Sequence, residues 1–237
     1  MNGPLAGAAP RFDPYAAVHK GLRALMADTL IALGRVDVGN PGEFHRTIDR
    51  VVEMLDFCRS HARHENQFLH PAIEMRAPGS TGASAIDHAL HEQAIDQLKK
   101  TALQLPETPV AQRTMAVLEL YRSVALFVAH NLEHLHREET AHNTTLWAHY
   151  TDAQIEALHD ELVASIEPAQ SIFIMRWMLP AMNPAERERL VRKLRATAPP
   201  QVVEAVLHAV RDVLEPQAWS VLAALPAATA NGQFAEA

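Results

Sequence analysis

The sequence has little that would build a sheet, a disulfide framework or a membrane span. It contains 9 glycines among 237 residues and only 5% aromatic residues, although 48% of its residues are hydrophobic. The core must therefore come mostly from Ala, Leu, Val, Ile and Met, a composition that favours an all-α protein. The single cysteine, Cys58, excludes an internal disulfide and is typical of a reducing compartment.

An excess of positive charge is also missing. The formal net charge is −7 with neutral histidines, so no basic surface points to nucleic acid or to an anionic membrane. No window approaches the roughly 18 uninterrupted apolar residues of a spanning helix. The first eleven residues, MNGPLAGAAPR, lack a positive segment followed by an apolar stretch. We therefore expect no transmembrane helix, no signal peptide and a cytoplasmic protein that binds neither nucleic acid nor membrane.

Apolar residues recur with helical spacing along four long segments. Asp13 can cap the first segment with Pro14 in its first position, and Ser84 can cap the third. Pro71 is expected to kink the second segment near its end. The segments cover about residues 13–36, 43–75, 84–100 and 110–148. Long helices separated by short breaks predict an up-down-up-down four-helix bundle over residues 13–150.

Shorter segments separated by prolines follow the predicted bundle. They predict a smaller helical C-terminal region over residues 151–225, which either packs against the bundle or forms a homodimer interface. The ends of the chain, residues 1–12 and 226–237, have few residues to bury and are expected to be disordered.

Histidine is abundant, with 14 copies, and two helical turns combine it with glutamate in the same pattern. His61 precedes Glu65 by four residues, and His134 precedes Glu138 by four. This spacing places both side chains of a pair on one face of a helix. An imidazole and a carboxylate presented together form half of a metal site. Two such turns on facing helices would complete one.

The first and third helices can each add an imidazole to this site. The first offers His19, and the third offers His88 or His91. Counting depth along the helices from Asp13 and Ser84 favours His91, although His88 lies on the same face and could replace or join it.

Carboxylates from two helices can bridge a pair of metal ions. We expect Glu65 and Glu138 to bridge, His19 and His61 to hold one ion, and His91 and His134 to hold the other. Nitrogen and oxygen ligands without thiolate favour two non-haem iron ions, with zinc or manganese as alternatives, over an iron–sulfur cluster or a structural zinc site.

Two stretches resemble the haemerythrin-like, HHE cation-binding family. HARHENQFLHP, residues 61–71, is similar to its H-x3-E-E-x3-[LF]-x-P signature with Asn66 in place of the second acid, and HNLEHLHREE, residues 130–139, repeats the H-x3-E-E part. The resemblance covers residues 13–150 and implies a four-helix bundle. The ligand set that it implies is His19, His61, Glu65, His91 (or His88), His134 and Glu138.

The third and fourth helices depart from the oxygen-carrying haemerythrins, which have H-x3-H and H-x4-D at these places. The sequence therefore resembles the four-histidine, two-carboxylate branch, which is linked to iron–sulfur repair, nitric-oxide and oxygen responses, and iron sensing. This implies a di-iron protein in oxygen, nitric-oxide or redox sensing or in iron handling, with a small diatomic or oxo ligand in an open position.

Two other functions stay open. One is a di-iron oxidoreductase acting on peroxide or nitric oxide, and the other is a helical interaction protein whose metal is only structural. Because the sequence shows neither a flavin nor a nucleotide motif, a metal-binding protein is favoured over an enzyme.

The remaining histidines have simpler expected roles. His64, His70, His136 and His142 are expected at the surface or as hydrogen-bond partners of ligands, and His130 is left open as a ligand because it precedes His134 by four residues. Cys58 is expected to be a small core residue.

Overall fold

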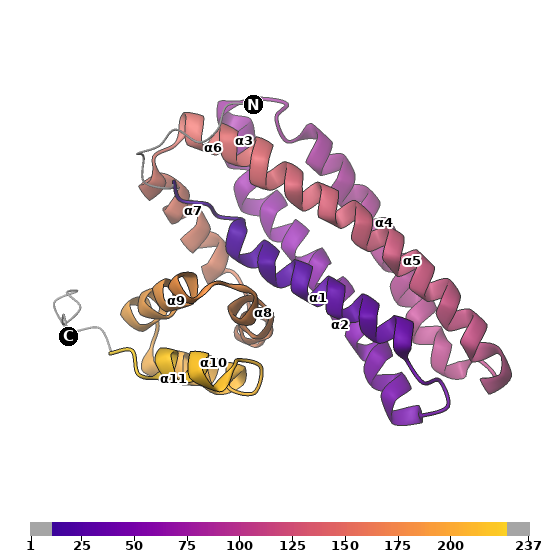
Figure 1. Ribbon diagram of the computed structural model, residues 1–237. Coiled ribbons are helices and arrows are strands. Elements are labelled where there is room, and N and C mark those ends of the chain that lie inside the picture. The colour runs from indigo at the N-terminus through magenta and orange to yellow at the C-terminus, as the bar shows by residue number, and fades with distance from the viewer. Residues whose placement is uncertain (1–10, 227–237) are drawn as a thin grey trace, which may run out of the picture. The chain divides into compact units, whose positions relative to one another are not determined.

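The computed structural model describes residues 11–226, and within this range the chain is helical and has no strand (Figure 1). The all-α prediction is confirmed. The ends predicted to be disordered lie outside the described residues, except for Arg11, Phe12 and Pro226. Among residues 11–226, no helix combines the length and the apolar character that a membrane span requires.

The described chain divides into two compact units. The first contains residues up to Ala16 and from Val36 to Ser165, and the second contains residues 17–35 and everything from Ile166 onward. The first long helix, α1 (Ala16–Arg35), therefore belongs almost entirely to the second unit. The predicted domain limits at residues 13–150 and 151–225 stay a prediction.

Long helices interrupted by π turns dominate the first unit. α4 packs against both α2 and α5, and the three run side by side in Figure 1. The elements are α2 (Pro41–His64), η1 (Glu65–Leu69), α3 (His70–Arg76), α4 (Gly82–Gln104), η2 (Leu105–Glu107), α5 (Val110–Arg137), η3 (Glu138–His142), α6 (Asn143–His149) and α7 (Asp152–Ala164).

Two of these elements, η1 and η3, are π turns, in which a backbone N–H donates to the carbonyl five residues earlier. His70 donates to Glu65 at the end of η1, and Asn143 donates to Glu138 at the end of η3. Pro71, which has no N–H and cannot continue the α-helical ladder, follows η1 directly. The structure thus places a π turn just before the proline where the sequence predicts a kink.

The starts of two helices test the predicted caps. The Asp13 carboxylate accepts hydrogen bonds from the N–H groups of Tyr15 and Ala16 at 2.9 and 3.0 Å. The helix begins at Ala16 with Tyr15 in the N-cap position, so the predicted cap at Asp13 with Pro14 in the first position lies two residues too early. The prediction for Ser84 is wrong, because α4 begins at Gly82 and Ser84 lies inside its first turn.

A small apolar cluster joins the segments that follow the π turns. Tyr15, Leu69, Ile73, Leu146 and Ile155 are buried against one another, so α3, α6 and α7 share one core. The hydroxyl of Tyr150 donates to the carbonyl of Ala72 at 2.7 Å and adds a polar link between the same segments. This packing fixes the ends of both helices that carry a π turn.

The second unit joins α1 to four shorter helices. Each of the four has proline in its first position, where the missing N–H costs no hydrogen bond. They are α8 (Pro168–Ala181), α9 (Pro184–Thr197), α10 (Pro200–Val210) and α11 (Pro216–Ala223). α1 approaches α8 closely at Gly21, where an added Cβ would lie 3.0 Å from the Cα atom of Met178.

We expect Gly21→Ala to destabilise the protein by about 1 kcal/mol, because overpacking against backbone exceeds the gain in helix propensity. The free energy of unfolding from chemical denaturation measures the change. Gly82→Ala is the matched control, since an added Cβ there meets no atom within 4 Å. Equal effects of the two substitutions would contradict the close α1–α8 contact.

Candidate metal centre

The two H-x3-E turns place an imidazole beside a carboxylate, as their spacing predicts. His61 Nε2 lies 3.1 Å from Glu65 Oε1, and His134 Nε2 lies 3.1 Å from Glu138 Oε1. Both carboxylates are almost fully buried, with 2% and 0% of the glutamate side chains exposed. Each glutamate is also the first residue of a π turn, a feature frequent at functional sites.

The two carboxylates converge with imidazoles from α4 and α5. Glu65, His88, His134 and Glu138 each offer one ligand atom, and these atoms all lie within 4.8 Å of one another. His88 Nε2 lies 2.8 Å from His134 Nε2, 3.4 Å from Glu65 Oε2 and 3.6 Å from Glu138 Oε1. We call these four buried residues the central cluster.

Residues around the central cluster orient its two imidazoles. His134 Nδ1 lies 3.2 Å from Asp87 Oδ2, and His88 Nδ1 lies 2.9 Å from Asn66 Oδ1. Asp87 is itself held by an ion pair with Arg137. An oxygen acceptor on Nδ1 fixes the tautomer of a histidine and leaves the Nε2 lone pair for a cation.

The comparisons with known proteins agree with this geometry. The family model described as "Hemerythrin HHE cation binding domain" matches residues 13–142. The chain belongs to this family. Neither the comparison with curated proteins nor that with solved structures gives a match. The protein is therefore a metal-binding, haemerythrin-like protein, and the predicted helical bundle is the fold that its family implies.

The central cluster contains His88, whereas the depth argument favours His91. Within residues 11–226, no candidate metal group contains His91, whose ring centroid lies 5.1 Å from that of His134. The depth argument counted from Asp13 and Ser84, but α1 begins at Ala16 and α4 begins at Gly82, so both of its starting points are misplaced. The geometry thus favours His88, and the assignment of the ligand stays a prediction.

His19 lies in α1, which belongs to the second compact unit. Its assignment as a ligand stays a prediction.

The central cluster attracts positive charge. Burial alone would lower the pKa of His88, but the carboxylates of Glu138 and Glu65 raise it to about 9. Burial and the charge of Glu65 oppose ionisation of Glu138, yet hydrogen bonds with His134 and His88 hold its pKa below the usual range. Two buried carboxylates therefore need a proton on His88 or a metal cation. Nitrogen and oxygen donors without sulfur suit a first-row divalent ion.

Two histidines that the sequence analysis expected at the surface, or as partners of ligands, lie inside. His70 and His142 are buried, and with Glu138 they form another group whose ligand atoms lie within 4.8 Å of one another. Each follows a glutamate of the central cluster by about one helical turn, and this spacing is the feature of the sequence that could have predicted their position near the cluster. Cys58 is a buried core residue as expected, and burial raises its pKa to about 12.

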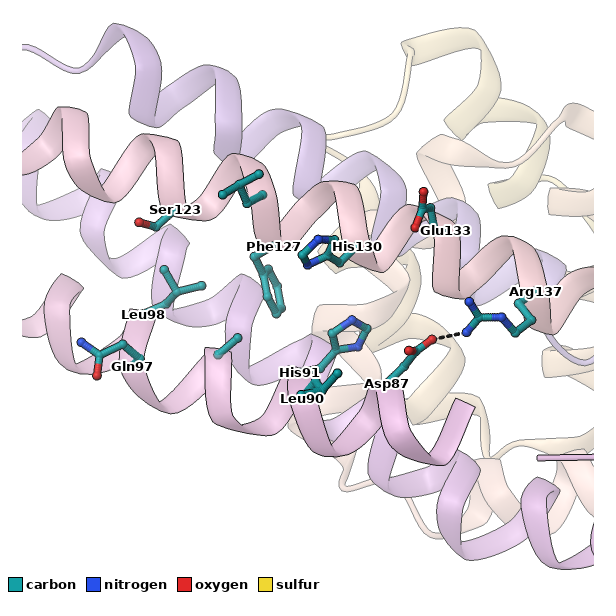
Figure 2. Close-up of a pocket in the computed structure, with 12 residues that line it drawn as sticks. Asp87, Leu90, His91, Gln97, Leu98, Ser123, Phe127, His130, Glu133 and Arg137 are labelled. Atoms are coloured by element: carbon teal, nitrogen blue, oxygen red, sulfur yellow. Dashed lines mark hydrogen bonds and ion pairs between the residues drawn. The ribbon is translucent and has the colours of Figure 1, made fainter. Parts of the chain in front are cut away.

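A pocket of about 480 Å³ lies between α4 and α5 (Figure 2). Figure 2 shows His91 and Phe127 pointing into the space between these helices, with the Asp87–Arg137 ion pair at one end. His130, which was left open as a ligand, is exposed and lines this pocket. The pocket therefore reaches the residues that contact His134 directly.

Asp87 offers a test of the orienting hydrogen bond on His134. We expect Asp87→Asn to weaken metal binding by about 10- to 100-fold, because the partner of a metal-bound histidine sets its orientation and basicity. Competition with a chromogenic chelator measures the affinity. Asp96→Asn is the control, because Asp96 lies in α4 as Asp87 does but is exposed and pairs with Arg59 of α2. Equal metal affinities of the Asp87→Asn and Asp96→Asn variants would rule out the role of Asp87 in orienting His134.

The choice between His88 and His91 is open to a direct comparison. We expect His88→Gln to remove metal from the purified protein and His91→Gln to leave most of it, because only His88 lies among the central carboxylates. Metal content per chain measures both variants. Greater loss from His91→Gln would restore the ligand set favoured by helix depth.

Proposed function

We propose that this haemerythrin-like protein binds two non-haem iron ions and responds to oxygen, nitric oxide or redox state. One observation carries the proposal: two buried carboxylates from separate helices share a site with imidazoles and with no sulfur ligand. Paired carboxylates with terminal imidazoles are suited to iron, whereas a structural zinc site is built mainly from thiolates.

Each ligand has a role in this proposal. Glu65 and Glu138 bridge the two ions, because each carboxylate has two oxygens and the two glutamates both belong to the central cluster. His88 and His134 are terminal ligands of one ion. His61, which lies against Glu65, holds the other ion together with His19.

Bound iron would supply an open coordination position for a small diatomic or oxo ligand. The protein's own contribution is to hold the ligands in a buried setting and to admit such a molecule. The pocket between α4 and α5 supports an entry route, because its lining includes His91 and Asp87, which contact His134.

The cellular location of the protein and its partners belong to the same proposal. A reducing cytoplasm suits a single buried cysteine and ferrous iron. The helices of the second unit are proposed as the place where a homodimer would form, and nucleic acids and membranes are not proposed as partners.

Elemental analysis of the purified protein tests the metal and its number. We expect about two irons per chain, and we expect Glu65→Gln and Glu138→Gln to lower the iron content severalfold because a bridging carboxylate contacts both ions. Glu139→Gln is the matched control, since Glu139 neighbours Glu138 but lies outside every candidate metal group within residues 11–226. Equal iron in all three variants would contradict the assigned bridges.

The same iron-loaded protein distinguishes sensing from catalysis. A sensor is expected to change its absorption spectrum when anaerobic protein meets nitric oxide or oxygen, without consuming either over many turnovers. Sustained consumption in the presence of a reductant would favour an oxidoreductase instead. An unchanged spectrum would favour a structural metal.

A further inference from the structure

The two H-x3-E turns do not account for every buried histidine near them. His70 directly follows the first π turn, and His142 ends the second. Both side chains are buried, with 6% and 1% of their surface exposed. Their rings meet edge to face, with centroids 5.2 Å apart, so the two helices bring them to one place.

The π turns explain how these histidines reach the glutamates. His70 donates its N–H to the carbonyl of Glu65, five residues earlier, so one wide turn separates the two residues. His142 follows Glu138 by four residues within the other π turn. Each helix therefore presents a histidine, a glutamate and a second histidine in sequence, in place of the H-x3-E pair alone.

His70 has a buried nitrogen without a hydrogen-bond partner. Within the described part of the chain, nothing donates to or accepts from its Nε2 atom. Its ring stacks on His88, with centroids 5.0 Å apart and 4° between the planes, and this contact satisfies no polar atom. The buried Nε2 atom of His70 is therefore available to a cation.

His142 is held by hydroxyl groups on both sides of its ring. Its Nδ1 atom lies 3.3 Å from Tyr15 Oη, and its Nε2 atom lies 3.2 Å from Ser84 Oγ. Both ring nitrogens are thus hydrogen-bonded, and a cation bound to one of them would replace the hydroxyl on that side. The hydroxyl on the other nitrogen would then orient the ring as a ligand.

We propose that His70, Glu138 and His142 form a further cation position beside the central cluster. One ligand atom from each residue lies within 4.8 Å of the others. Two imidazoles and one carboxylate are a ligand set for a first-row divalent metal with open positions. The position lies wholly within the first unit, and it rests on the proposed metal centre because both use Glu138. A carboxylate has about four lone-pair sites, which is enough to serve both positions.

Cobalt(II) binding to the metal-free protein tests this position. Equilibrium dialysis counts the ions bound per chain in the wild type, His70→Phe and His142→Asn. We expect each variant to bind about one ion fewer than the wild type, because each loses one of three ligands. His136→Phe is the control, since His136 is an exposed histidine close to the same π turn.

The outcomes separate this inference from the proposed function. Full cobalt binding by both variants, together with loss of cobalt in Glu65→Gln, would overturn the further position and leave the central cluster standing. A wild type that binds no cobalt would overturn both.

A measurement on the wild type alone does not depend on how the variants fold. Crystals of the cobalt-loaded protein are expected to show an anomalous difference peak between His70 Nε2, His142 and Glu138, apart from any peak at the central cluster. Density at the central cluster with none beside His70 would overturn the inference.

Discussion

The burial of two carboxylates close to each other is the constraint on which the rest of this structure depends. Glu65 and Glu138 are almost fully buried and each contributes an oxygen to the same cluster. Burying an unpaired charge costs several kcal/mol, so the fold requires positive charge between them. Without a metal, the proton held by His88 supplies that charge, as its raised pKa indicates. A divalent cation supplies it more fully and replaces that proton.

The surrounding structure is arranged around this requirement. Both glutamates begin a π turn, and the apolar cluster of Tyr15, Leu69, Ile73, Leu146 and Ile155 joins the segments that follow those turns. Asn66 and Asp87 fix the outer nitrogens of His88 and His134. The side chains of the central cluster thus lie on packed helices, and the tautomers of His88 and His134 are fixed before any cation binds, which would lower the entropic cost of ordering them on binding.

Local spacing made part of this site predictable, and tertiary packing decided the rest. The pairs His61–Glu65 and His134–Glu138 follow from a four-residue repeat within one helix. Choosing His88 over His91 needs the contacts of His88 with Glu65 and Glu138, which no count along the helices provides. His70 and His142 looked peripheral because their burial depends on π turns. Proline hints at the first of these turns, and no residue signals the second. The grouping of α1 with the C-terminal helices likewise depends on contacts that no local pattern encodes.

Iron K-edge X-ray absorption of the iron-loaded protein tests the central claim most directly. Carboxylates shared by two ions predict a first shell of nitrogen and oxygen only, with a second iron about 3.5–4 Å away. A sulfur scatterer in the first shell, or iron without a neighbouring metal, would contradict a centre bridged by Glu65 and Glu138.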